Sequence, residues 1–218
     1  MSETELRGTL QVGATALGIG LTSQQADRLL EYLLLLQRWN KTYNLTSIRG
    51  LDQMLVQHVF DCLSAVPPLR RESPPDAHRL LDVGSGGGLP GAVIAILNSQ
   101  VEVTCVDSVG KKAAFVQQVS AELGLSNLRA SHARVETLDD LGFQVVISRA
   151  FASLAEFTSL TRGAIGTTGI WAAMKGQTPA DEIAKLPKDI DVFHVEQLSV
   201  PGVDLQRCIV WMRAKQSL

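Results

Sequence analysis

The hydrophobic and polar positions divide this chain into a helical first part and an alternating second part. Over residues 1–66 hydrophobic side chains recur every three or four positions, most clearly in the stretch 51–66. This spacing puts them on one face of a helix and predicts a helical extension with a buried side. Thr22 and Gln25 form a capping-box pattern that predicts a helix start, and the polar and aromatic segment 39–50 predicts an ordered loop.

A proline-rich segment separates the two parts. Four of the eight prolines lie between Pro67 and Pro75. Because Pro-Pro pairs do not continue a helix, the segment predicts a linker over residues 67–78. We therefore expect an N-terminal helical extension at 1–66, this linker, and a second domain at 79–218.

From residue 79 onward, short apolar runs alternate with helical stretches. The runs predict seven strands, at residues 79–84, 101–107, 127–132, 143–149, 169–175, 191–200 and 206–214. Strands that alternate with helices form mostly parallel sheets covered on both faces. The last two strands are too close in sequence for a crossover helix and should pair antiparallel as a hairpin. The predicted fold class is α/β: a Rossmann-like, mostly parallel seven-stranded sheet with an N-terminal helical extension.

Composition and charge narrow the function classes. Lys and Arg total 20 against 22 Asp and Glu, so the formal net charge is −2. This excludes a uniformly basic nucleic-acid coat protein and leaves room for a local basic face. The three cysteines are far apart, which argues against a zinc site or a disulfide scaffold, so we expect no metal. No secretory leader or membrane-length apolar run is visible; we expect a cytoplasmic protein without a membrane partner, and nothing implies an oligomer.

The most informative segment is the glycine-rich stretch LLDVGSGGGLPG at residues 80–91. It follows a predicted strand and precedes a predicted helix, which is where open parallel sheets bind ligands. Gly86, Gly88 and Gly91 match the spacing of a dinucleotide fingerprint. Asp82, two positions before the first glycine, would repel a diphosphate and suit a cation. S-adenosylmethionine has no phosphate and carries an ammonium and a sulfonium group, so we favour this methyl donor, with NAD as the alternative.

A second candidate lies at the end of the next predicted strand. Asp107 follows Gly84 by 23 residues and is placed to accept both ribose hydroxyls of a nucleoside cofactor. NAD and S-adenosylmethionine sites share this feature, so Asp107 supports a nucleoside without choosing between them. The alternative is a residue that only begins the helix predicted at 111–124. The loop and this carboxylate together point to Gly84, Gly86 and Asp107 as cofactor-binding residues.

Several segments together resemble one known family. DVGSGGGLPG, VDSVGKKAAFVQQV, SRAFASL and KGQTPADEI, with WNKTYNLTSI and HVFDCL in the first part, are similar to the bacterial 16S ribosomal RNA guanine-N7 methyltransferases. This is the RsmG family, formerly called glucose-inhibited division protein B. The resemblance runs in consistent order from residue 28 to residue 213. It implies a class I S-adenosylmethionine-dependent methyltransferase domain at 79–218, with S-adenosyl-L-methionine as the cofactor.

The resemblance also implies residues of the cofactor site. These are Gly84 and Leu89 in the glycine loop, Val135 and Glu136 after the third predicted strand, and Arg149 at the end of the fourth. Val135 and Glu136 would flank the adenine, with an ordinary solvated helix start as the alternative. Arg149 ends an apolar strand at the edge of the sheet where ligands bind, with a surface salt bridge as the alternative.

Three residues are expected to bind the substrate: Asn44, Arg149 and Lys175. Lys175 ends the fifth predicted strand and is placed to hold a substrate phosphate or the cofactor carboxylate. Asn44 matches a family position near the active cleft, with a turn or cap residue as the alternative. His58 and Asp61 share one helix face. They predict an acid–base or metal pair or, as we favour, a hydrogen-bonded structural pair.

The implied reaction needs no general base. Guanine N7 carries an in-plane lone pair and no proton at neutral pH. Methyl transfer to it therefore depends mainly on placing N7, the methyl carbon and the sulfur in line. For this reason we assign no catalytic residue.

The expected partner is ribosomal RNA or the small ribosomal subunit. Arg38, Lys41 and Arg49 flank Trp39 and Tyr43, a composition suited to phosphate contacts and base stacking, with burial of Trp39 in the core as the alternative. Two other interpretations stay open. One is a small-molecule methyltransferase or NAD-dependent enzyme on the same fold, and the other is an RNA-binding module without catalysis.

Overall fold

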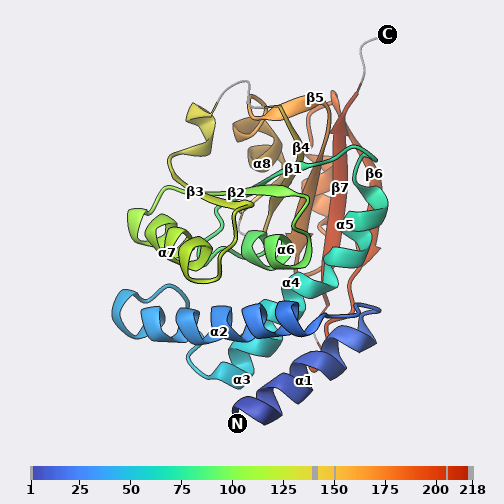
Figure 1. Cartoon of the computed structure of the whole chain (residues 1–218). Coiled ribbons are helices and arrows are strands. Elements are labelled where there is room, and N and C mark those ends of the chain that lie inside the picture. Colours follow the sequence, from blue (N-terminus) through green and yellow to red (C-terminus); the bar gives the residue numbers. More distant parts are fainter. Residues whose placement is uncertain (1, 139–141, 150, 205, 216–218) are drawn as a thin grey trace.

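The computed structural model describes residues 2–138, 142–149, 151–204 and 206–215. Within them a seven-stranded sheet has the order β3-β2-β1-β4-β5-β7-β6 (Figure 1). The strands are β1 (Arg79–Val83), β2 (Glu102–Asp107), β3 (Leu128–His132), β4 (Phe143–Ser148), β5 (Ile165–Lys175), β6 (Ile190–Gln197) and β7 (Cys208–Ala214). Neighbours among the first five strands pair parallel, whereas β7 pairs antiparallel with both β5 and β6. The predicted mostly parallel sheet and its terminal hairpin are therefore confirmed, in a sheet that is mixed overall.

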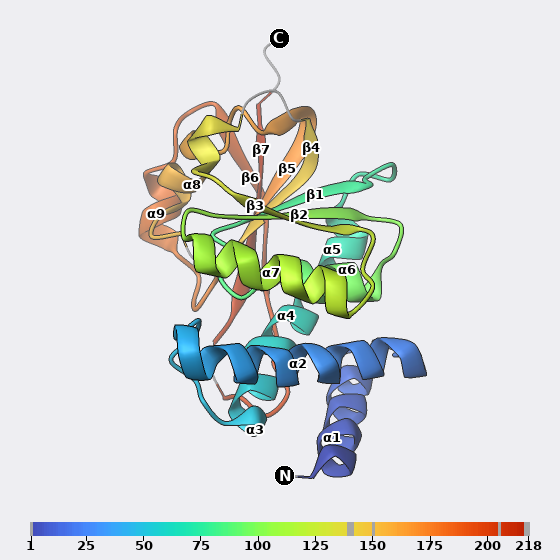
Figure 2. The ribbon, with the colours of Figure 1, turned by 60° about the vertical axis from the view of Figure 1, so that its left-hand side comes forward.

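Helices surround this sheet on both faces and at one end. They are α1 (Glu3–Ala16), α2 (Ser23–Tyr43), α3 (Leu51–Met54), α4 (Asp61–Ser64), α5 (Val66–Glu72), α6 (Gly91–Leu97), α7 (Gly110–Glu122), α8 (Leu154–Leu160) and α9 (Ala180–Ala184). A π-helical segment, η1 (Leu55–Phe60), joins α3 to α4, and a short 3-10 turn, η2 (Val135–Thr137), follows β3. Helices α1, α2 and α3 gather at one end of the molecule, and α2 runs alongside α6 and α7 (Figure 2).

Alternating strand residues supply two hydrophobic cores, one on each face of the sheet. On β1, Leu80 belongs to the core that α6 and α7 cover, and Leu81 to the core that α8 covers. The side-chain period of two in a strand produces this division. The first core also contains Leu10 of α1, Leu33 of α2 and Val93 of α6. The helical extension and the sheet therefore bury their apolar side chains together, and the division of the chain into domains stays a prediction.

The proline-rich segment differs from its prediction. Helix α5 runs from Val66 to Glu72, so Pro67 and Pro68 lie in its first turn. Helix α4 ends at Ser64, so the pair does not continue a helix, as expected. The linker predicted from residue 67 is wrong as far as Glu72, because the pair begins a new helix, whose first-turn N–H groups have no intrahelical partner to lose. Only residues 73–78 form turns and loop before β1.

The helix start at Thr22 is confirmed, whereas the loop predicted at 39–50 is shorter than expected. The Thr22 hydroxyl accepts the Gln25 N–H at 3.2 Å, and the Gln25 side chain accepts the Thr22 N–H at 3.0 Å. Helix α2 continues to Tyr43 and ends where Asn44 adopts a left-handed conformation with φ of +49°. The loop therefore covers residues 44–50.

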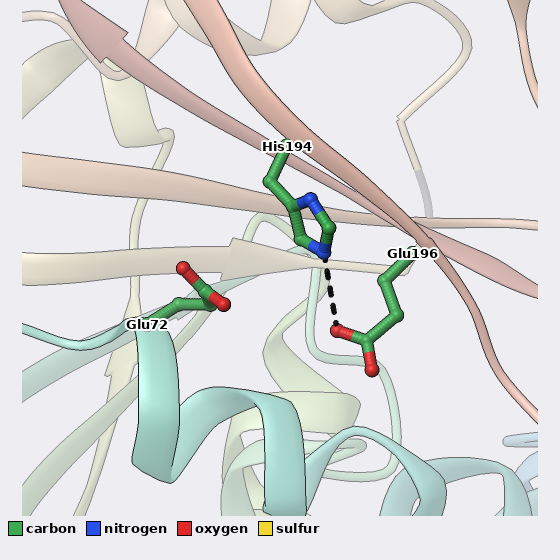
Figure 3. Close-up of side chains that lie close together, drawn as sticks. All are labelled: Glu72, His194 and Glu196. Atoms are coloured by element: carbon green, nitrogen blue, oxygen red, sulfur yellow. Dashed lines mark ion pairs between the residues drawn. The ribbon is translucent and has the colours of Figure 1, made fainter.

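An ion-pair cluster ties α5 to the edge strand β6 (Figure 3). Glu72 from α5 faces His194 and Glu196 from β6. One imidazole nitrogen of His194 and one carboxylate oxygen of each glutamate lie within 4.8 Å of one another. The Arg71 guanidinium pairs with the carboxylates of both Glu72 and Glu196. Because Arg71 bridges the carboxylates of the helix and of the strand, we interpret the cluster as a structural link between α5 and β6.

None of the helices in the described part of the chain combines the length and the apolar character that crossing a membrane requires.

Candidate functional site

The glycine loop between β1 and α6 depends on backbone conformations that favour glycine. Gly84, Gly86 and Gly88 have φ of +66°, +57° and +77°. The Gly84 N–H bonds to the Val106 carbonyl on β2 at 2.9 Å, which holds the start of the loop against the neighbouring strand. A Cβ at Gly88 would lie 3.1 Å from Cγ2 of Val116 on α7. The loop is therefore tight on its inner side, and glycine lets it stay so.

Asp82 lies beneath this loop and is fully buried. Its Oδ2 accepts the N–H of Gly91, the first residue of α6, at 2.7 Å. Among the described side chains, its Oδ1 is one of two buried polar atoms without a hydrogen-bond partner. Burial raises the pKa of the Asp82 carboxyl to about 7. The carboxyl anchors the start of α6, and positive charge on the other side of the loop would stabilise its ionised form.

A first hollow of about 290 Å³ opens at the carboxyl ends of β1 and β2. Four of the expected cofactor residues line it: Gly84, Asp107, Val135 and Glu136. Phe151 and Leu160 add apolar surface to the same hollow. The hollow thus combines carboxylates with a flat apolar wall, which suits a ribose joined to an aromatic base.

Asp107 connects the two loops that border this hollow. One of its oxygens accepts the Gly86 N–H at 2.9 Å and the other accepts the Val109 N–H at 2.9 Å. Its side chain is 6% exposed, and the Lys112 ammonium lies 3.7 Å away. A carboxylate oxygen has a second lone pair, so both oxygens can still accept hydroxyl groups.

A second hollow of about 220 Å³ lies along the glycine loop. Gly84, Gly86, Leu89 and Arg149 line it, all of them expected cofactor residues. The remaining wall includes side chains from the helical extension and its loop, namely Leu36, Leu45, Thr46 and His58, together with Lys112 from α7. The extension therefore completes this hollow.

A third hollow of about 360 Å³ adjoins the second, and Arg149 and His58 line both. Its lining includes an ion triad around a buried carboxylate. Asp61, 4% exposed, accepts Nη1 of Arg149 at 2.9 Å on one oxygen and Nε of Arg207 at 2.9 Å on the other. Lys175 lines the same hollow. The three hollows thus follow one another along the edge where the parallel strands end.

His58 and Asp61 do not form the hydrogen-bonded pair that we favoured. Nε2 of His58 lies 2.9 Å from the Thr46 hydroxyl, and Nδ1 lies 3.2 Å from the Gln57 carbonyl. Burial, and next the charge of Arg149, lower the pKa of His58 to about 4, so its imidazole is neutral near pH 7. Both residues line the third hollow, but His58 contacts Thr46 whereas Asp61 binds the two arginines.

Lys175 and Asn44 occupy different surroundings. The Lys175 ammonium bonds to the Glu182 carboxylate at 2.9 Å and to the Phe151 carbonyl at 3.1 Å, so its charge is neutralised at the wall of the third hollow. The Asn44 side chain accepts a hydrogen bond from Arg49 at 2.9 Å. Asn44 caps α2 and lies outside the residues that line the three hollows. Asn44 therefore marks the point where α2 ends and the loop that carries Thr46 begins.

The aromatic pair near the end of α2 divides between core and surface. Trp39 is half-buried and meets Phe115 of α7 with ring centroids 5.5 Å apart. Tyr43 stacks on Trp39 at 5.0 Å and is 42% exposed. Arg38 pairs with Glu122 at 3.1 Å. Trp39 therefore belongs partly to the core, and Tyr43 is the exposed member of the pair.

Thr46, Lys112 and Arg207 were missed in the sequence. For Arg207 a signal exists, because it directly precedes an antiparallel strand. The start of such a strand lies at the same edge as the ends of its parallel neighbours. Thr46 and Lys112 carry no comparable local signal.

Comparison with known proteins agrees with this architecture. The family model described as rRNA small subunit methyltransferase G matches residues 25–210. The Ribosomal RNA small subunit methyltransferase G of Leptothrix cholodnii is 58% identical over 96% of this chain and 96% of that protein. The protein of the same name from Acidovorax ebreus is 55% identical over 98% of this chain and 97% of that protein.

Solved structures share the fold at low sequence identity. A SAM-dependent methyltransferase from Aquifex aeolicus matches with a TM-score of 0.56 and 14% identity, over 73% of this chain and 92% of that chain. TrmN from Thermus thermophilus matches with a TM-score of 0.55 and 17% identity, over 98% of this chain and 80% of that chain. The predicted class I methyltransferase fold is thus confirmed, and so is the resemblance inferred from the sequence motifs. This chain belongs to the rRNA small subunit methyltransferase G family.

Proposed function

We propose that this protein transfers a methyl group from S-adenosylmethionine to N7 of a guanine in 16S ribosomal RNA. The observation that carries the proposal is the row of three adjoining hollows, in which Gly84 lines the first two and Arg149 the last two. In this chain of the methyltransferase G family, the row offers separate places for a nucleoside, an amino-acid group and an acceptor base. A ribosomal RNA substrate would also be consistent with the cytoplasmic location that we propose.

The residues present fit S-adenosylmethionine. In the first hollow, Asp107 would accept the ribose hydroxyls, and Val135 and Glu136 would hold the adenine. In the second hollow, Gly86 presents no Cβ, and a Cβ there would meet open space, so the methionyl group can approach the loop backbone. Lys112 lines this hollow and supplies positive charge for the cofactor carboxylate. The bound cofactor supplies an electrophilic methyl group on its sulfonium.

The same contacts disfavour a dinucleotide. A diphosphate binds to free N–H groups of a glycine loop and of the helix that follows it. Here the Gly86 N–H is bonded to Asp107, and the Gly91 N–H is bonded to Asp82. Both amides already face carboxylates, which repel phosphate. The charge arrangement therefore supports the methyl donor over NAD.

The third hollow supports a positioning mechanism. Guanine N7 needs no base to remove a proton, and His58 is held neutral by burial beside Arg149. Arg149 and Arg207, fixed by Asp61, form a rigid cationic wall suited to the phosphates and guanine edge of RNA. Lys175 and Asn44 stay proposed substrate-binding residues, Lys175 at the wall of this hollow and Asn44 at the loop beside it. Rate enhancement then comes from aligning N7 with the methyl carbon.

Two measurements test the function. Calorimetric titration with S-adenosylmethionine and, separately, with NAD identifies the cofactor. Binding of NAD alone would overturn the proposal. Methyl transfer is then measured with labelled cofactor on free 16S ribosomal RNA and on small subunits, both from cells that lack this protein. We expect one labelled guanosine, identified as 7-methylguanosine by mass spectrometry of nuclease digests.

A result with cofactor binding but no labelled RNA in either form would favour a small-molecule methyltransferase. The two RNA forms also distinguish free RNA from the assembled particle as the substrate. Adenine or cytosine methylation would refute the assignment to guanine N7.

A further inference from the structure

A buried tyrosine of the helical extension contacts the glycine loop directly. The Tyr32 hydroxyl on α2 donates a hydrogen bond to the Gly87 carbonyl at 2.6 Å, across 55 positions of sequence. Tyr32 is fully buried, and Gly87 is buried as well. Burial raises the pKa of the Tyr32 hydroxyl well above its ordinary value, so it keeps its proton and acts as a donor.

Leu36 reinforces this contact one helical turn later. Its Cδ1 lies 3.2 Å from the position of a Cβ on Gly87, and the Tyr32 hydroxyl lies 3.6 Å from the same point. Residues four apart on a helix share one face, so Tyr32 and Leu36 meet the loop side by side. Gly87 and Leu36 both line the second hollow. The ring of Tyr32 also lies 6.2 Å from that of Phe115 on α7.

The other contacts of the loop come from the opposite side. Gly84 and Ser85 donate to the Val106 carbonyl at 2.9 and 3.2 Å, and Gly86 donates to Asp107 at 2.9 Å. These contacts attach the loop to β2. The Tyr32 hydroxyl holds it from the helical extension, so the loop lies between two anchors.

We propose that Tyr32 is a positioning residue for the cofactor: by holding the Gly87 carbonyl, it keeps the glycine loop in the conformation that binds S-adenosylmethionine. Without the hydroxyl, a buried carbonyl loses its partner and the loop populates other conformations. The apparent affinity for the cofactor falls with the fraction of molecules in the competent conformation. The helical extension thereby sets cofactor affinity as well as completing the hollow.

The test compares Tyr32→Phe with Ser120→Ala in the full chain. Both changes remove only a hydroxyl that donates to a backbone carbonyl. Ser120 lies toward the end of α7, where its Oγ is 2.9 and 2.8 Å from the carbonyl oxygens of Leu125 and Leu128 and can donate to either of them. We expect Tyr32→Phe to weaken S-adenosylmethionine binding by about threefold to tenfold in calorimetry. Its KM for the cofactor rises by the same factor, whereas kcat and the KM for RNA stay unchanged. Ser120→Ala keeps wild-type cofactor affinity.

A second readout needs no cofactor. The N–H groups of Gly88 and Leu89 bond to the Ser85 carbonyl, both at 2.9 Å, and should exchange with solvent faster in Tyr32→Phe than in the wild type. The inference rests on the proposed function, but the two fail differently. A wild-type protein that binds no S-adenosylmethionine overturns the function. Wild-type cofactor affinity in Tyr32→Phe, or an equal loss in Ser120→Ala, overturns the role of Tyr32, as does unchanged exchange at the two loop amides.

Discussion

Replacing Asp107 by asparagine exchanges one carboxylate oxygen for an amide nitrogen and keeps the shape of the side chain. In the structure both oxygens are in use, one on the Gly86 N–H and the other on the Val109 N–H, each at 2.9 Å. The new NH₂ group must face one of these donors. One backbone amide therefore loses its acceptor, and the other keeps a neutral acceptor in place of a charged one.

The size of the effect follows from these contacts. A hydrogen bond to a charged group contributes about 1.5–3 kcal/mol, so we expect the free energy of unfolding to fall by about 2 kcal/mol. For a chain of 218 residues this lowers Tm by about 4–8 °C. The ribose hydroxyls also lose a charged acceptor, which weakens S-adenosylmethionine binding by at least about tenfold.

Thermal unfolding without cofactor and calorimetric titration measure the two effects separately. Asp191→Asn is the matched control, because Asp191 pairs with Arg213 on the exposed side of β6. An exposed pair contributes less than about 1 kcal/mol, so the control should keep nearly the wild-type Tm and the wild-type cofactor affinity. An unchanged Tm in Asp107→Asn would show that Asp107 does not hold the two loops. An unchanged affinity would refute its contact with the ribose.

Two further predictions concern the buried charges of the third hollow. Asp61→Asn leaves Arg149 and Arg207 without their carboxylate and should lower the free energy of unfolding, measured in urea titrations, by about 3–5 kcal/mol. Adding Arg207→Gln removes one of the two unpaired charges and should recover part of the loss. A double variant less stable than the single one would contradict this reasoning. His58 has a pKa lowered from 6.5 to about 4 in the folded protein. The unfolded chain therefore binds more protons between these values, and His58 lowers stability as pH falls from 6.5 toward 4. His58→Gln should reduce this loss in urea titrations between pH 4 and 7.5, and equal pH slopes in the two proteins would count against it.

Local sequence patterns were sufficient for much of the fold. Short apolar runs predicted the seven strands, and the short connection between the last two predicted the terminal hairpin. The strand order and the antiparallel pairing of β6 with β7 confirm both predictions. The helix start at Thr22 follows from a capping pattern only four residues long. The linker predicted from Pro67 was wrong as far as Glu72, because a proline pair that ends one helix can be followed by a loop or can begin another helix. Which of the two occurs depends on how α5 packs, and that is not a local property.

The glycine loop and the carboxylate at the end of β2 were visible in the sequence, because a tight ligand-binding loop needs positive φ angles and the last residue of a strand lies at one edge of the sheet. The sequence did not show the distant side chains that bind the glycine loop and the charged residues beside it. Asp61 meets Arg149 across 88 positions and Arg207 across 146, and Tyr32 meets Gly87 across 55. Such pairs form only when the helical extension packs against the sheet. The sequence by itself predicted the segments that form the proposed cofactor site, and the tertiary structure alone decided which side chains hold the glycine loop and balance the charges beside it.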